Sequence, residues 1–184
     1  MVVNLTETSF VVAGFFGSNK IDPVKYRRLT QAELNDVREQ FVTFLIAHGI
    51  PADDWEGLKR DAPANAEKLV ELFSEMVWDQ TLEQVRYLEY KEAQDVKCFD
   101  CGAEKIEMLG LFIEGHTDVD LRQADDPRAM LQKVRAAGAS VKLYSMEKAI
   151  QGERKAELFR MMEGGCTISR DGALYRALKQ LRPD

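Results

Sequence analysis

The spacing of apolar residues changes near Arg86, and this change constrains the fold more than any other feature of the sequence. Before it, apolar residues recur every three or four positions, which is typical of helices with one buried face. After it, aromatic and β-branched residues gather in short runs that favour strands. The sequence therefore predicts an α+β chain, with a helical segment over residues 30–85 and a small antiparallel sheet with further helices over residues 86–184.

The first predicted helix has a defined beginning. Thr30 and Glu33 have the spacing of a capping box, in which each side chain accepts a hydrogen bond from the other residue's amide. Apolar residues then continue at helical spacing until Gly49 and Pro51 end the pattern. We expect a short second helix after Pro51 and a long third helix over residues 63–85.

The second half is predicted to begin with a three-stranded antiparallel meander, with Gly102 in a hairpin connection. Asp126 and the proline after it have the pattern of a helix start. The elements expected after that helix are a short strand at 141–145, a helix at 149–163, an edge strand at 166–168 and a last helix from about residue 171.

Four segments of the chain resemble a family of small uncharacterised proteins known mainly from the Bacteroidetes. They are K-Y-R-R-L-T at 25–30, G-I-P-A-D-D-W-E at 49–56, A-E-K-L-V-E-L-F-S-E at 66–75 and E-L-F-R-M-M-E-G-G at 157–165. The resemblance implies a domain of unknown function, without catalytic or cofactor-binding residues. Family members begin at a methionine directly before K-Y-R-R, a position that Val24 occupies here. We therefore interpret residues 1–23 as a non-native or flexible extension and residues 24–184 as a single domain.

Composition excludes several classes of function. A formal net charge of −6 argues against a nucleic-acid-binding surface, although both ends of the domain are locally basic. Three cysteines, an odd number, favour reduced thiols in a cytoplasm over a disulfide framework. The apolar run at 10–16 is too short to span a bilayer and has no basic residue before it, so we expect neither a membrane span nor export.

Two groups of residues have the chemistry of metal ligands. Cys98 and Cys101 have the C-x-x-C-G spacing of one zinc knuckle, but the second pair of ligands that a closed zinc site needs is missing. His116, Asp118 and Asp120 would lie on one side of an extended segment and could hold a divalent cation. Buried thiols and a solvated turn are the alternative interpretations, so we expect no cofactor, with zinc as the exception to test.

The long helix carries an acidic stripe that could bind a basic partner. Its residues are Glu67, Glu71, Glu75, Asp79 and Glu83, spaced four apart. Lys25, Arg27 and Arg28, in this chain or in a second copy, are candidate partners by charge. The alternative is an outer helix face in contact with water, because charge runs on helices usually face solvent.

The leading hypothesis is a small cytoplasmic, non-enzymatic adaptor or regulatory protein-binding module that binds a protein partner or self-associates. One alternative is a metal-dependent enzyme or zinc-stabilised module that uses the two groups of candidate ligands. A further alternative is binding of RNA or a ribonucleoprotein through the basic ends, whose later part contains Arg170, Arg176, Lys179 and Arg182.

Overall fold

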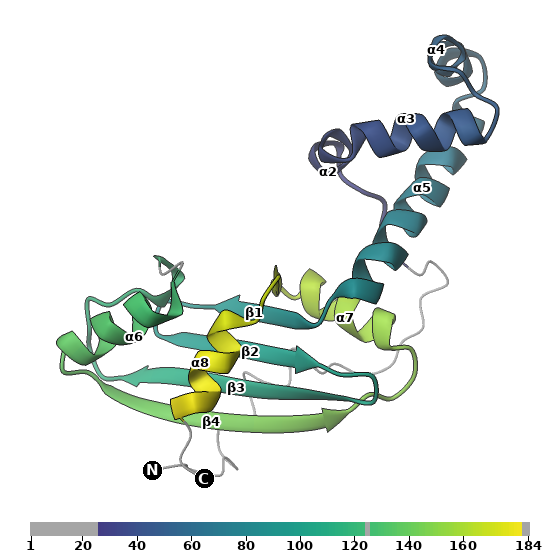
Figure 1. The fold of residues 1–184 in the computed structure, drawn as a ribbon. Coiled ribbons are helices and arrows are strands. Elements are labelled where there is room, and N and C mark those ends of the chain that lie inside the picture. The colour runs from purple at the N-terminus through teal and green to yellow at the C-terminus, as the bar shows by residue number, and fades with distance from the viewer. Residues whose placement is uncertain (1–25, 124–125, 182–184) are drawn as a thin grey trace. The chain divides into compact units, whose positions relative to one another are not determined.

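A computed structural model describes residues 26–123 and 126–181 of the chain, and the fold is α+β (Figure 1). The chain divides into two compact units, with the boundary between Glu83 and Gln84. The first unit is helical and the second carries the sheet, so the division falls close to the change of pattern at Arg86. Residues 1–23, which we interpret as an extension, lie outside the described residues, and so does Lys25.

The helical unit contains α2 (Gln31–Asp36), α3 (Arg38–Ala47), α4 (Ala52–Asp61) and most of α5 (Pro63–Gln84). The predicted capping box is present. The Glu33 amide donates to the Thr30 hydroxyl, and the Thr30 amide donates to the Glu33 carboxylate over 2.7 Å. The single helix expected after this box is interrupted at Val37, whose φ of −109° and ψ of 25° are not helical.

Aromatic side chains form the centre of the helical unit. The ring of Phe73 on α5 is completely buried, and it lies 4.9 Å from the Phe41 ring and 5.3 Å from the Phe44 ring, measured between centroids. Phe41 also contacts Trp55 edge to face at 5.3 Å. Three helices are thus held together by rings that come from each of them.

The second unit is built on an antiparallel sheet with the strand order β4-β3-β2-β1-β5. Its strands are β1 (Tyr87–Lys91), β2 (Asp95–Cys101), β3 (Lys105–Glu114), β4 (Ser140–Ala149) and β5 (Thr167–Ser169). The predicted meander is confirmed, and Gly102 closes the hairpin between β2 and β3 by donating its amide to the carbonyl of Lys105. The predicted edge strand is β5, displaced by one residue.

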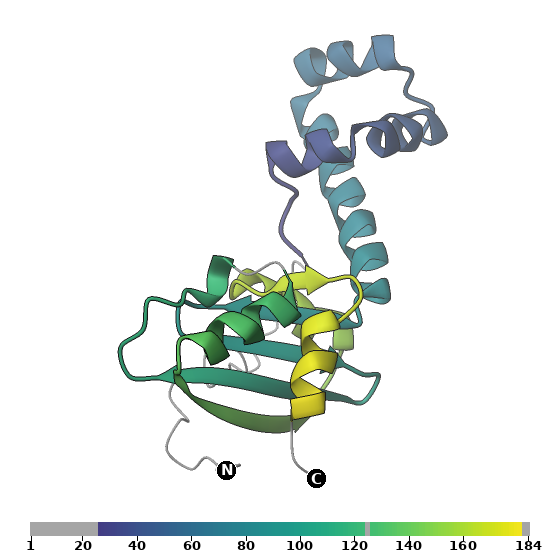
Figure 2. The same ribbon diagram turned by 60° about the vertical axis from the view of Figure 1, so that its left-hand side comes forward.

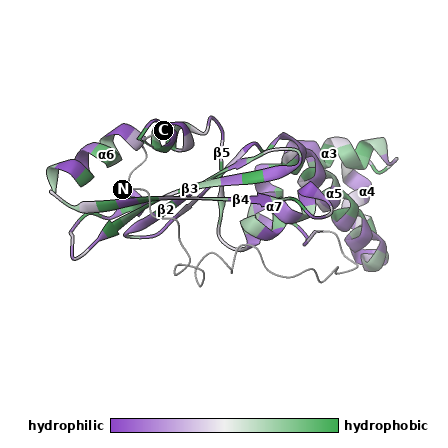
Figure 3. Cartoon of the chain, turned by 90° about the horizontal axis from the view of Figure 1, so that it is seen from below, coloured by the Kyte–Doolittle hydropathy of each residue, from purple (hydrophilic) through white to green (hydrophobic). Residues whose placement is uncertain are grey.

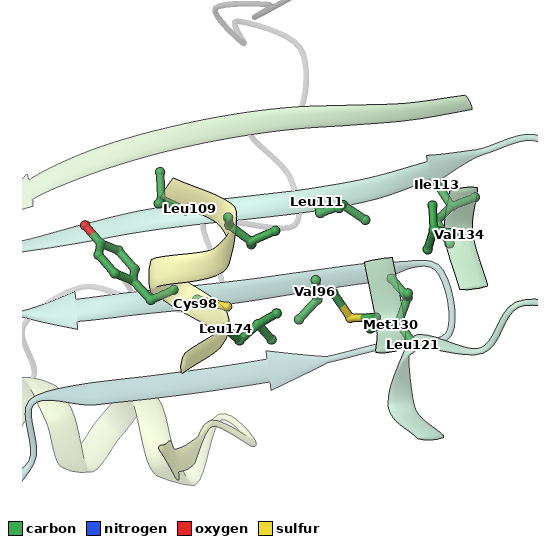
Figure 4. Packing of buried hydrophobic residues seen from close by; sticks show 11 residues of the cluster. Val96, Cys98, Leu109, Leu111, Ile113, Leu121, Met130, Val134 and Leu174 are labelled. Atoms are coloured by element: carbon green, nitrogen blue, oxygen red, sulfur yellow. The ribbon is translucent and has the colours of Figure 1, made fainter. Parts of the chain in front are cut away.

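Helices lie on both faces of this sheet. Figures 1 and 2 show α6 (Pro127–Ala136) and α8 (Ala173–Leu181) over one face, and Figure 3 shows α7 (Arg154–Glu163) on the other. The short 3-10 helix η1 (Leu121–Gln123) precedes α6. Alternate residues of β2 and β3 form a core with α6 and α8 (Figure 4). This core contains Val96, Cys98, Leu109, Leu111, Ile113, Leu121, Met130, Val134, Leu174, Tyr175 and Leu178.

The strand expected at 141–145 is twice that length in the structure. β4 pairs with the whole of β3, from Glu114 opposite Ser140 to Lys105 opposite Ala149. Ala149, the expected first residue of the next helix, is therefore the last residue of the strand, and α7 begins only at Arg154, after Gly152 with a φ of +101°. A long neighbouring strand thus overrides the helical spacing of the local sequence.

Candidate functional site

A cavity of about 330 Å³ lies beside β5, at one edge of the sheet, on the side that carries α6 and α8. This volume is at the lower end of the range for ligand-binding pockets. Its lining includes Glu89 and Lys91 from β1, Thr167 and Ser169 from β5, Arg170 and Asp171 from the following turn, and Met130 and Leu174 from α6 and α8. We refer to it as the β5 cavity.

The turn between β5 and α8 depends on a glycine. Gly172 has a φ of +61°, and a Cβ at this position would lie 2.5 Å from the ring of Tyr87. Only glycine combines this backbone conformation with such a close ring. The turn places Asp171 at the start of α8, where its carboxylate accepts a hydrogen bond of 3.1 Å from the Ala173 amide.

Charges at the β5 cavity are not evenly compensated. Glu89 forms an ion pair of 3.3 Å with Lys91 on the same strand. Asp171 accepts the Ala173 amide and lies 4.0 Å from the Arg176 guanidinium. Arg170 is exposed and has no hydrogen bond or ion pair with any described residue. Both lining acids thus have a partner, while one lining base has none.

The wall formed by α6 and α8 is apolar. Met130 and Leu174 are 1% and 2% exposed, and both belong to the core between the sheet and these helices. The rim carries two acids, Glu89 and Asp171, and two bases, Lys91 and Arg170, so the charges that line the cavity balance formally.

The opposite face of the sheet carries a buried polar cluster. Lys97 is 1% exposed, forms an ion pair with Asp95, and lies 5.3 Å from the centre of the Tyr90 ring. The Tyr144 hydroxyl donates to the other oxygen of Asp95 over 2.6 Å. Burial, together with this hydrogen bond, raises the pKa of Tyr144. These polar groups satisfy one another, as buried charges must.

The two cysteines of the C-x-x-C segment point to opposite faces of β2. Successive side chains of a strand alternate, so residues three apart lie on different faces. Cys98 belongs to the core under α6 and α8, whereas Cys101 lies on the other face, and both thiols are buried. Burial raises the pKa of both thiols, in Cys101 to about 12. The structure therefore does not bring this pair together around one ion.

The second group of candidate ligands lies in the segment between β3 and η1. His116 and Asp118 are exposed there, and Asp120 is held by the Arg122 guanidinium at 2.6 Å. This contact lowers the pKa of Asp120 to about 2. Across residues 26–123 and 126–181, no three His, Cys, Asp or Glu side chains are arranged to hold a metal ion.

The candidate partner-binding residues meet one another in the helical unit. Arg28 lies 2.9 Å from the carboxylate of Glu71 and 3.7 Å from that of Glu67. The Tyr26 hydroxyl donates to Asp79 over 3.4 Å. Part of the acidic stripe thus contacts the basic segment of the same chain, as charge complementarity predicts.

Arg27 and Glu75 also belong to the candidate partner-binding residues. Arg27 binds Glu33 through both nitrogens of its fork and lies 5.0 Å from the centre of the Trp78 ring. Glu75 is exposed to solvent. Binding of a separate partner by these charged residues stays a prediction.

The β5 cavity was not predictable from the sequence. Arg170 belongs to a basic C-terminal patch and an edge strand is predicted beside it, but no local pattern links them to Lys91, which lies on a distant segment. One signal was available. Thr167, Ser169 and Asp171 alternate along the edge strand and its turn, a spacing that places polar side chains on one side of an extended segment.

The fold and the β5 cavity define a mixed α+β protein with an antiparallel sheet and a cavity at one sheet edge. Residues 24–182 match the model of a family of unknown function (DUF6495), and the chain belongs to this family. No curated protein and no solved structure matches the chain. Among the described helices, none has the length and apolar character needed to span a membrane.

Proposed function

We propose that this chain is a cytoplasmic, non-enzymatic protein-binding module that takes an extended segment of its partner along β5. The observation that carries the proposal is the β5 cavity beside an edge strand. Within the described chain, β5 pairs only with β1, so its other side has backbone groups without a strand partner. A peptide that pairs with such an edge gains affinity from main-chain hydrogen bonds and specificity from a side-chain pocket.

The opposite edge of the sheet is less suited to this role. β4 carries Lys142, Glu147 and Lys148, which form ion pairs with Glu114, Lys105 and Glu157. Charged side chains on an edge strand discourage the addition of a further strand. β5 instead presents Ile168, which is 40% exposed, and the hydroxyl side chains of Thr167 and Ser169.

Buried thiols support the non-enzymatic character and the reducing compartment. All three cysteines are free and buried, and burial raises the pKa of Cys166 to about 12. A thiol that stays protonated is a poor nucleophile.

The test is selection of random peptides against the full chain, followed by mapping of the bound peptide by NMR. We expect enriched peptides to protect from exchange those amides of β5 (Thr167–Ser169) that point away from β1. Thr167→Trp fills part of the β5 cavity and should abolish binding. The matched control is Ser145→Trp, which places the same bulk at an exposed position on β4 and should leave binding intact. Equal binding by both variants, or no enriched peptide, would overturn the proposal.

A further inference from the structure

We infer that the outer face of α6 and α8 binds the phosphate backbone of a double-stranded nucleic acid. This face is not used in the proposed peptide binding along β5. The two helices contact each other over the same face of the sheet, so their exposed side chains belong to one surface (Figures 1 and 2). Neither helix contains an acidic residue. Their charged residues, all exposed, form what we call the basic face: Arg128, Lys133, Arg135, Arg176 and Lys179.

The charges on α6 are not compensated within the described part of the chain. The side chains of Arg128, Lys133 and Arg135 form no hydrogen bond or ion pair with a described residue. The acids that precede the two helices, Asp126 and Asp171, accept hydrogen bonds from backbone amides of the first turns. The uncompensated charge of the basic face is therefore positive, and its complementary ligand is anionic.

Helix stability does not account for all of these positive charges. Lys133 and Arg135 lie in the last turn of α6, where a cation complements the helix dipole. Arg128 lies in the first turn, where the dipole disfavours a cation. Arg128 and Arg135 are two turns apart on the same side of α6, a separation of about 10 Å along the helix. An extended polyanion can therefore contact both guanidinium groups.

The acidic net charge of the chain comes from the helical unit. Acids outnumber bases two to one over residues 26–83, whereas the two are equal in number over residues 84–184. The basic face belongs to the sheet-bearing unit, which is a separate compact unit. Interactions between exposed charges are screened over about 8 Å at physiological ionic strength. A local basic surface can therefore attract phosphates although the chain as a whole is acidic.

The composition of the basic face favours a nucleic-acid duplex over other polyanions. None of the large apolar side chains exposed in the described chain lies on α6 or α8. A protein interface has an apolar centre, and a helix that binds a bilayer inserts apolar side chains. Phosphates need only cations and hydrogen-bond donors, which arginine presents as a planar fork. The two helices also expose no aromatic ring on which unpaired bases would stack, so the expected ligand is double-stranded.

The experiment titrates the full chain into fluorescently labelled RNA and DNA duplexes of one random sequence. With about four phosphate contacts, the affinity should fall about a hundredfold between about 50 and 200 mM salt. Binding of either duplex with this salt dependence supports the inference, and the tighter of the two identifies the duplex that fits. No binding at low salt, or an affinity that does not change with salt, would overturn it. Tighter binding of poly-L-glutamate, or of phosphatidylserine–phosphatidylcholine vesicles, would also overturn it and would identify a protein-binding or membrane-binding surface.

A pair of double variants tests where the duplex binds. Arg128→Gln with Arg135→Gln should weaken binding at least about tenfold and lower the slope of log K against log salt by about two, one for each lost phosphate contact. The control is Arg38→Gln with Lys68→Gln, which removes the same charge from exposed positions on α3 and α5 and should leave the slope unchanged. An unchanged slope in the α6 variant, or equal effects of the two pairs, would overturn the inference. All four positions are exposed, so both variants should fold, and urea denaturation verifies this.

Discussion

The ring of Tyr144 on β4 lies directly over Gly110 on β3, and a Cβ at Gly110 would be only 2.1 Å from its Cζ atom. The absence of a side chain at Gly110 lets the ring cross β3, so that its hydroxyl reaches Asp95 on β2. Three neighbouring strands are thus connected through one glycine and one tyrosine.

Gly110→Ala should therefore destabilise the sheet-bearing unit. The added methyl group meets the middle of a ring that is 8% exposed, and overpacking of this kind costs about 1 to 3 kcal/mol. Urea denaturation measures the loss. Gly57→Ala on α4 is the control, because nothing lies within 4 Å of its Cβ position, and it should be neutral or stabilising by up to about 1 kcal/mol. Equal effects of the two substitutions would contradict the close packing at Gly110.

Lys97→Met should be strongly destabilising, because it leaves the Asp95 carboxylate without its cation in a largely buried site. Breaking a buried ion pair on one side costs about 3 to 5 kcal/mol, which denaturation measures directly. Adding Asp95→Asn removes the uncompensated charge and should restore part of the stability. Lys133→Met, at an exposed position on α6, is the control and should change little. A double variant no more stable than Lys97→Met would show that Asp95 is not the source of the loss.

The three thiols should be unreactive in the folded protein. Cys98, Cys101 and Cys166 are at most 4% exposed, and burial raises the pKa of each thiol. At pH 8, a disulfide reagent such as DTNB should label none of them in the native state and all three in denaturant. Rapid native labelling of one thiol would contradict its burial.

Removal of metal should leave the stability unchanged. Cys98 and Cys101 lie on opposite faces of β2, so a single ion does not reach both sulfur atoms without rearrangement of the strand. The measurement combines elemental analysis of protein purified without added metal with thermal unfolding before and after chelation. Stoichiometric zinc, together with a lower melting temperature in the chelator, would show that a metal site exists and that this prediction is wrong.

The helical unit should lose stability in acid through Glu33. Its hydrogen bonds with Arg27 lower the pKa of the Glu33 carboxyl from 4.5 to about 2. The ionised form is favoured in the folded state, so its contribution is complete above pH 4.5 and is lost as the pH falls toward 2. Glu33→Gln keeps the capping-box spacing without the charge. The free energies of unfolding of the two proteins should therefore differ at pH 6 and converge toward pH 2. A constant difference would contradict this role of Glu33.

Features that depend on neighbours in the sequence were predictable. Thr30 and Glu33, three residues apart, form the capping box of α2. Asp126 caps α6 by accepting hydrogen bonds from the amides of Arg128 and Ala129. Helix ends are satisfied by side chains within one turn, so a short segment contains all the necessary information. The change of periodicity near Arg86 likewise predicted the α+β class, with the helices before the meander.

Features that depend on distant segments were not predictable from the local pattern. Residues 146–149 belong to β4 because the full length of β3 is available for pairing. Lys97 is buried beside Asp95 of its own strand and the Tyr90 ring of β1, and the Tyr144 hydroxyl of β4 binds the same Asp95 carboxylate. In both cases residues of neighbouring strands take part, so the outcome depends on register.

The β5 cavity shows the same division. The sequence by itself determined an edge strand near residue 167, a last helix from about residue 171 and a basic side chain at Arg170, because each follows from local residue type. Only the tertiary structure brought Lys91, Met130 and Leu174 to that strand and opened a cavity among them. Long-range packing decides which surfaces meet and where space remains between them, and that information is spread over the whole chain.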